Sequence, residues 1–200
     1  MARTVDPERH AARRLHIIDA ALTCFAADGY DGSTTAAICR TAGIGSGTFF
    51  HYFPTKAAVL LAILELGTDE TRDWFAGQTG RTDAREVLLD WVRHSAGELA
   101  DPRVAGFVRV VGAVMSEPDV SAALEADERA QHQELLPWVR KARADRHVRA
   151  DLSADDLTRW IVLVIDGFVG RITSSPAFDA EAQRATLLDT VERLLAPAGG

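Results

Sequence analysis

Residues 33–56, STTAAICRTAGIGSGTFFHYFPTK, decide how the first part of the chain folds. The stretch predicts two short helices joined by a tight turn at Gly43, because glycine readily adopts the left-handed conformation that ends a helix. The hydroxyls of Thr34 and Thr35 can accept backbone N–H groups at the start of the first helix. The second helix is expected to begin near Gly45–Ser46, which gives a helix-turn-helix.

The second helix of this pair presents two different faces. Phe49 and Phe53 lie four residues apart and are expected to turn inward. The other face carries small, hydroxyl and ring side chains that can approach base edges and phosphates closely. Its residues are Ser46, Gly47, Thr48, Phe50, His51 and Tyr52. The pattern predicts a recognition helix that enters the major groove of DNA, the alternative being an ordinary two-helix corner of an all-α domain.

The region from about Arg13 to Leu64 resembles the DNA-binding domain of the tetracycline-repressor (TetR) family of transcriptional regulators. The matching segments are RRLHIIDAALTCFAADGY at 13–30 and STTAAICRTAGIGSGTFFHYFPTKAAVL at 33–60. The resemblance implies that Thr34 and Thr35 face DNA phosphates and that Lys56 touches the DNA backbone. It also implies that the six residues of the open face line the recognition helix.

Two positions depart from the family pattern. Gly45 stands where the family usually has a serine or a similar helix-capping residue, so Ser46 is expected to take over as the cap. Phe50 stands where a tyrosine is common in the family. Without the phenol, one hydrogen bond to a DNA phosphate is expected to be missing.

The composition fits one large or two small globular domains. The 200 residues are 47% hydrophobic, which is enough for a sizeable core, and the formal net charge is −7. The first 60 residues are close to neutral, so the later residues carry the negative charge. An acidic body held away from the phosphates favours sequence-dependent DNA binding over a general nucleic-acid coat or an architectural DNA binder.

Beyond the helix-turn-helix, hydrophobic residues recur at helical spacing, and no segment has the period of a strand. The sequence therefore predicts an all-α fold: a helix-turn-helix three-helix domain at 1–54 and a helical effector-binding and dimerisation domain at 55–200. Thr55 is expected to cap the helix that joins these domains, and this helix is expected to be their only continuous connection. Ser153 and Asp156 form a second predicted cap.

The stretch at 157–172, LTRWIVLVIDGFVGRI, is apolar nearly all round. A helix of this kind must be covered on more than one side, and Gly167 and Gly170 would let another helix approach closely. Together with the helix expected at about 179–195, it predicts a four-helix bundle formed with a second copy of the chain. The expected interface residues are Trp160, Val164, Phe168, Leu188, Val191 and Leu195. The alternative is a deep core within one chain.

The resemblance also implies that the helical body holds a small-molecule effector. The expected pocket residues are Trp91, Phe107, Val111, Met115 and Trp138. This lining is aromatic and aliphatic with few polar groups, which suggests a largely apolar or aromatic effector of moderate size. For any one of these residues, the alternative is a place in the packed core.

The sequence contains no pattern typical of a catalytic or metal centre. The six histidines lack ligand spacing, and neither a nucleophile elbow nor a phosphate-binding glycine loop is present, so no cofactor and no metal are expected. The charged run Glu125–Glu134 is expected to be a solvated helix face. Asp166 is a carboxylate inside an apolar run, and if it is buried it needs a partner such as Arg159 or Arg171. It could anchor a ligand, although a salt bridge at an interface or helix end is the favoured interpretation.

These observations predict a DNA-binding transcriptional regulator that catalyses no reaction. It is expected to be a ligand-responsive repressor that binds a palindromic double-stranded DNA operator as a homodimer. No hydrophobic run is long enough for a membrane span and no signal-peptide core is present, so the expected location is the cytoplasm. The alternative is a helical ligand carrier or an enzyme with a vestigial DNA-binding head.

Overall fold

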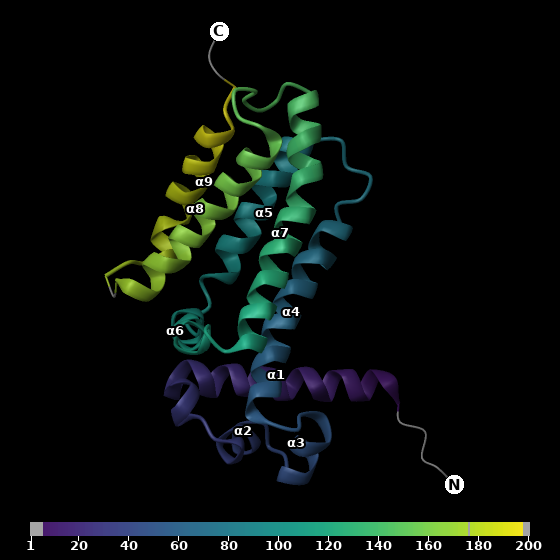
Figure 1. The fold of residues 1–200 in the computed structure, drawn as a ribbon, viewed down its shortest axis with the longest axis vertical. Helices are drawn as coiled ribbons and strands as arrows, with labels where there is room; N and C mark the ends of the chain where they lie inside the picture. The colour runs from purple at the N-terminus through teal and green to yellow at the C-terminus, as the bar shows by residue number, and fades with distance from the viewer. Residues whose placement is uncertain (1–5, 176, 198–200) are drawn as a thin grey trace. The chain divides into compact units, whose positions relative to one another are not determined.

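The computed structural model describes residues 6–175 and 177–197, and all regular secondary structure in them is α-helical (Figure 1). The helices are α1 (Pro7–Gly32), α2 (Thr35–Thr41), α3 (Ser46–Tyr52), α4 (Lys56–Ala76), α5 (Ala84–Glu98), α6 (Val104–Val114), α7 (Pro118–Ala144), α8 (Ala154–Ser174) and α9 (Ala180–Leu195). The predicted all-α fold with an N-terminal helix-turn-helix is confirmed. Among the described residues no single helix is both long and apolar enough to span a membrane. Helices α3 and α4 meet that test only as a pair bent by 54°.

The described residues form two compact units. The first unit contains the residues up to Leu66 together with Gly106–Leu124, and the second contains Gly67–Ala105 and the residues from Glu125 onward. The chain therefore passes between the units three times, and α4 and α7 each contribute residues to both. The expectation that the helix following Thr55 is the only continuous connection is wrong, because most of α6 and the start of α7 pack with the N-terminal helices. The functional domains 1–54 and 55–200 remain a prediction.

The core of the first unit explains why its short helices form. Helices α2 and α3 have seven residues each, and helices of this length are unstable alone in water. Ile38 of α2 and Phe49 of α3 are fully buried in one cluster with Phe25 of α1 and Val59 of α4. Burying a side chain of this size contributes about 1.5–3 kcal/mol, so the cluster stabilises both helices.

Most of helix α6 belongs to the first unit, where it lies directly on α1. A Cβ atom added to Gly106 would lie 2.7 Å from the Cα atom of Ala26 and closer still to its carbonyl oxygen. Glycine, which has no Cβ atom, is therefore the residue that permits this approach. Val110, one turn later on α6, is buried in the same core.

The second unit is built around a separate hydrophobic core. Helix α9 packs against both α5 and α8, and Leu88, Leu157 and Leu195, one from each helix, are fully buried. Helix α8 begins at the predicted cap. The backbone N–H of Asp156 donates to Ser153 Oγ at 3.0 Å, and the Ser153 hydroxyl donates to the Asp156 carboxylate at 2.6 Å.

We expect Gly106→Ala to destabilise the protein by about 1–3 kcal/mol, because the new methyl group overlaps the backbone of α1. Denaturant unfolding followed by circular dichroism measures this change.

Gly112→Ala is the matched control on the same helix. Gly112 is exposed and a Cβ atom there would meet no atom within 4 Å. Alanine is the better helix former, so this variant should be more stable by about 0.5–1 kcal/mol. Equal stability of the two variants would contradict the close approach of α6 to α1.

Candidate nucleic-acid interface

The turn between α2 and α3 has the geometry that the sequence predicts. Gly43 adopts the left-handed conformation with φ 59°. Thr34 Oγ1 accepts the backbone N–H of Ala37 at 3.1 Å, which caps the start of α2. The backbone N–H of Ile44 donates to the Cys39 carbonyl oxygen at 3.0 Å and closes the turn. These local contacts fix the direction in which α3 leaves α2.

Helix α3 buries one side and leaves the other open. Phe49 and Phe53 are buried, as predicted. Among the other residues of α3, Ser46, Gly47, Thr48, Phe50 and His51 are exposed, and Tyr52 is half-buried. The residues predicted to meet DNA thus lie where a double helix can reach them. Their individual roles remain a prediction.

Ser46 does not take over as the helix cap. The cap residue of α3 is Gly45, and no side chain in the described structure bonds to the N–H groups of this helix end. A capping side chain belongs to the residue that precedes the first helical one, whereas Ser46 is itself the first residue of α3. Its hydroxyl is therefore left on the open side of the helix.

Helix α1 supplies a residue that sequence reasoning missed, His10. The centre of its ring lies 4.5 Å from that of Tyr52 and 6.1 Å from that of His51. The three rings form an aromatic cluster that holds the end of α3 against the start of α1. Because His10 is distant from α3 in the sequence, no spacing rule links these positions.

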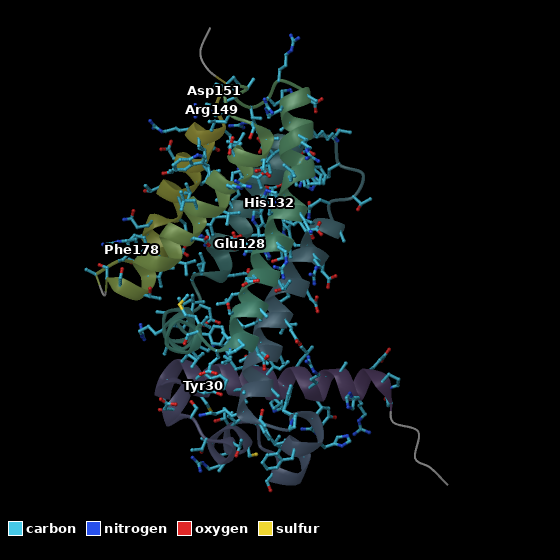
Figure 2. The ribbon with its side chains drawn as sticks, viewed as in Figure 1. Tyr30, Glu128, His132, Arg149, Asp151 and Phe178 are labelled. Atoms are coloured by element: carbon cyan, nitrogen blue, oxygen red, sulfur yellow. The ribbon has the colours of Figure 1, made fainter. Side chains whose placement is uncertain are left out.

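Lys56 ties the start of α4 to the end of α1. Its Nζ donates hydrogen bonds to the carbonyl oxygens of Tyr30 at 2.6 Å and Ser33 at 3.0 Å, and lies 4.1 Å from the centre of the Tyr30 ring. Figure 2 labels Tyr30 near the end of α1. Burial, followed by the negative charges of Asp31 and Glu117, raises the pKa of Tyr30 above its ordinary value of 10.0. The sequence did not predict that Lys56 would bond to the end of α1. Its contact with DNA remains a prediction.

The residues predicted for the dimer interface fall into two groups. Trp160 is 48% exposed, while Val164 and Leu188 are half-buried. The other group consists of Phe168, Val191 and Leu195. These three are buried in the core of their own chain, the last two completely, so they offer little or no surface to a partner.

Helix α8 nevertheless has an open apolar stripe. Leu163, one turn from Trp160, is 53% exposed and was missed by the sequence analysis, although its spacing from Trp160 is the signal that could have found it. Gly167 and Gly170 continue the same side, and a Cβ atom on either would meet nothing within 4 Å. We call Trp160, Leu163, Gly167 and Gly170 the α8 stripe.

The residues predicted to line an effector pocket do not share one unit. Trp91 and Trp138 belong to the second unit, whereas Phe107, Val111 and Met115 belong to the first. Trp91 is 4% exposed within an aromatic cluster, and Met115 is 56% exposed. Each unit contains a cavity, of about 530 Å³ in the first and about 340 Å³ in the second, and other residues line both. The pocket set remains a prediction.

Asp166 pairs with neither of the arginines that the sequence suggested. Arg159 Nη2 instead lies 2.9 Å from the Asp155 carboxylate, which is four residues away on the same helix. Partial burial, followed by the charges of Asp127 and Glu128, raises the pKa of Asp166 above 3.8. Within the described chain, no three potential ligands gather closely enough to hold a metal ion.

Two family models match the chain. The model for bacterial regulatory proteins of the tetR family matches residues 17–63. The model for the C-terminal part of BetI-type transcriptional repressors matches residues 80–196. Together they cover the helix-turn-helix and most of the helices that follow.

Individual proteins agree with these matches. The chain is 27% identical over 194 residues to the HTH-type transcriptional repressor Rv1474c of Mycobacterium tuberculosis, covering 94% of this chain and 95% of that protein. A TetR transcription regulator from Haloarcula marismortui has a similar structure, with a TM-score of 0.79 at 18% identity and coverage of 92% and 97%. The Bacillus subtilis regulator FadR, whose structure was solved in complex with stearoyl-CoA, has a TM-score of 0.71 at 18% identity. The match covers 90% of this chain and 98% of FadR.

We expect Lys56→Met to lower the free energy of unfolding by about 1–3 kcal/mol. The methionine keeps most of the stem but leaves the carbonyl oxygens of Tyr30 and Ser33 without the ammonium donor. Thermal or denaturant unfolding measures the loss.

Arg9→Met controls for the lost charge. Arg9 is exposed on α1, and its guanidinium makes no hydrogen bond within the described residues, so stability should change by less than about 0.5 kcal/mol. If the two variants lose equal stability, the hydrogen bonds of Lys56 are not what stabilises the end of α1.

Proposed function

The chain belongs to the TetR family of bacterial DNA-binding repressors, and we propose that it binds a palindromic operator as a homodimer and responds to a small molecule. Repression through the helix-turn-helix is the function of the family. The proposal concerns three further points: the symmetry of the complex, the residues that read the bases, and the response to a ligand.

The open side of α3 is the observation that carries the DNA-reading part of the proposal. Ser46, Gly47 and Thr48 are exposed in the first turn of α3, where small side chains allow close approach to base edges. His51 and Tyr52 follow at the other end, where rings and polar atoms suit phosphate and sugar contacts. A helix-turn-helix dimer would read two half-sites about one helical turn apart, or a multiple of that distance.

The α8 stripe supports a homodimer. Exposed tryptophan and leucine side chains are unfavourable in water, and covering them on association is favourable. Gly167 and Gly170 leave room for the backbone of a second helix to approach α8. Because a twofold axis brings the same surface of two copies together, one stripe would serve both subunits. A pair of identical recognition helices then matches a palindromic operator.

A small-molecule effector is the third part of the proposal. It rests on family membership, since a repressor that binds its operator needs a signal to release it. FadR, which shares the fold, holds stearoyl-CoA, so this helical architecture is compatible with ligand binding. An effector would release DNA only to the extent that it binds the DNA-free conformation more tightly than the DNA-bound one.

Catalysis is no part of the proposal, because the relatives act as transcriptional repressors. A repressor must reach chromosomal DNA, and for that reason we place it in the cytoplasm.

We expect Thr48→Ala to lose about 1–3 kcal/mol of preference for a selected operator over a scrambled duplex, if the hydroxyl or methyl of Thr48 contacts a base. The operator comes from selection out of a random DNA pool, and fluorescence anisotropy at several salt concentrations gives both affinities. Wild-type affinity should fall steeply as salt rises, because phosphate contacts release counterions.

Thr190→Ala, which removes a hydroxyl from exposed Thr190 of α9, is the control and should leave both affinities unchanged. Wild-type protein that binds selected and scrambled DNA equally would contradict a sequence-reading helix. An unchanged preference in the Thr48 variant would remove that residue from recognition.

We expect Gly167→Glu to convert the dimer to a monomer without unfolding it. The side chain enters open space in the single chain, and glutamate forms helix better than glycine, whereas a second helix could no longer approach. Analytical ultracentrifugation measures the assembly, and operator affinity should fall with it.

Gly67→Glu makes the same change at another open glycine, on α4, and should leave the sedimentation coefficient unchanged. A persistent dimer in the Gly167 variant would place the interface away from the α8 stripe.

A further inference from the structure

The end of α7 concentrates positive charge in a chain that is acidic as a whole. Residues 140–149 contain five of the chain's 22 lysines and arginines but only one of its 29 aspartates and glutamates. They form the last turns of α7 and the first part of the connection to α8. Cations stabilise the C-terminal end of a helix, which accounts for some of this charge. The contacts of the individual side chains separate that part from the rest.

Two of the five basic side chains have partners in their own unit. Arg149 forms a bidentate ion pair with Asp151, with nitrogen–oxygen distances of 2.7 and 2.6 Å, and Figure 2 labels both residues. Lys141 Nζ donates a hydrogen bond to the carbonyl oxygen of Arg81 at 2.8 Å, which ties α7 to the connection between α4 and α5. These two residues therefore have structural roles.

The other three basic side chains are Arg140, Arg143 and Arg146, which we call the α7 end patch. None of them forms an ion pair within the described residues. Arg140 and Arg146 are exposed, and Arg143 Nη2 donates to the carbonyl oxygen of Ala150 at 3.1 Å, which leaves its charge uncompensated. At 1.5 Å per residue the patch covers about 9 Å, close to the Debye length at physiological salt, so its charges act together. Asp145 offsets only one of the three.

Arg146 has an unusual backbone conformation. Its φ is 58°, and it is the one described residue other than glycine with a positive φ. The remaining positive-φ residues of the described chain are Gly29, Gly43 and Gly80. The N–H of Arg146 donates to the carbonyl oxygen of Arg143 at 3.0 Å, and the N–H of His147 donates to that of Ala142 at 2.9 Å. This is the hydrogen-bond pattern of a helix that ends in a left-handed residue, a position that glycine usually occupies.

An arginine at this position costs free energy that glycine would not cost. In the left-handed conformation the Cβ atom lies too close to the following carbonyl oxygen. The Arg146 side chain is exposed and makes no hydrogen bond within the described residues, so the fold gains no contact in return. Strained residues of this kind are typical of functional sites. The exposed guanidinium thus points to a partner outside the chain.

The chemistry of the α7 end patch selects the class of partner. Guanidinium groups pair with phosphate and carboxylate, so the partner is anionic. The large hydrophobic side chains that the described chain exposes all lie elsewhere: Leu15, Phe50, Met115, Trp160 and Leu163. Protein interfaces depend on apolar and aromatic anchors, and helices that bind membrane surfaces need an apolar face. Contact with DNA phosphates needs only positive charge, and a repressor works among chromosomal DNA.

We propose that the α7 end patch is a second DNA-binding surface, which holds the phosphates of a duplex other than the operator without reading its sequence. The negative charge of the rest of the second unit does not prevent this contact, because salt screens charges that lie beyond a Debye length. The contact is additional to the helix-turn-helix, so it does not depend on which operator α3 reads.

Gly47→Glu isolates the proposed surface in the full-length protein. Gly47 is exposed and a Cβ atom there would meet nothing within 4 Å, so the variant should fold. Its new negative charge lies on α3 and should prevent the helix-turn-helix from binding DNA. Fluorescence anisotropy with a short duplex of unrelated sequence should still show binding at about 50 mM salt, with a Kd on the order of 10⁻⁵–10⁻⁴ M.

Two further changes, each made in the Gly47→Glu protein, remove charges of the α7 end patch. Arg140→Gln and Arg146→Gly should each weaken this residual binding about tenfold at low salt and reduce its salt dependence by about one phosphate contact. Arg72→Gln is the matched control. It removes an exposed arginine of the second unit whose guanidinium is paired with Asp69 at 2.9 Å, so the affinity should not change.

The stability of Arg146→Gly separates DNA binding from a structural role. Glycine adopts the left-handed conformation without a Cβ clash, so this variant should have a higher melting temperature although it binds DNA more weakly. A lower melting temperature together with unchanged DNA affinity would show that the arginine has only a structural role.

A two-duplex assay tests whether the second duplex binds beside the operator. Wild-type protein is saturated with an immobilised operator duplex, and a labelled duplex of unrelated sequence is added. The labelled duplex should be retained by the wild type and by Arg72→Gln, and lost with Arg146→Gly. Retention that does not depend on Arg146 would contradict the proposal.

Three other results would overturn it. The first is a folded Gly47→Glu protein that binds no duplex at low salt. The second is equal weakening by Arg72→Gln and Arg140→Gln, which would make net charge alone responsible. The third is tighter binding to phosphatidylglycerol vesicles than to DNA through the same arginines, which would make the partner a membrane surface. Because Gly47→Glu disables the helix-turn-helix, each of these results leaves the repressor proposal standing.

Discussion

The DNA-binding end of the molecule depends on the burial of Phe49. Helix α3 is only seven residues long and has no side-chain cap, so little within the helix itself stabilises it. Phe49 is completely buried in the cluster that α1, α2 and α4 share. Since successive side chains are about 100° apart around a helix, fixing Phe49 inward places Gly47 and His51 on the far side of α3 and Thr48 and Phe50 on its flanks, away from the core. One packing contact thus sets which side chains remain available for DNA.

Local chemistry made part of this arrangement predictable. Three kinds of feature follow from residues within about four positions along the chain. They are the left-handed turn at Gly43, the hydroxyl caps at Thr34 and Ser153, and the inward direction of Phe49. In each case the deciding interaction joins residues that are close in the sequence. The recognition face could therefore be identified from sequence, together with the all-α fold.

Contacts between distant segments were not predictable in the same way. Lys56 bonds to Tyr30, 26 residues away, and sequence spacing does not say whether a lysine meets a carbonyl or a phosphate. Val191 and Leu188 are three residues apart on α9, yet the first is fully buried and the second only partly. Helical period shows that two residues share a face, but the neighbouring helices decide how much of it is covered.

Helix α7 contributes residues to both units, so a change along it can pass from one unit to the other. Its first residues, up to Leu124, belong to the unit that contains α3, and Glu128 follows one helical turn later in the second unit. A helix transmits rotation or displacement along its axis because each backbone hydrogen bond joins successive turns. An effector that contacts the later turns of α7 would therefore act on an element that continues into the DNA-binding unit. Its effect on operator affinity is limited to the difference between its affinities for the DNA-bound and DNA-free conformations, and DNA must change its affinity by the same factor. An effector that binds both conformations equally would leave repression unchanged.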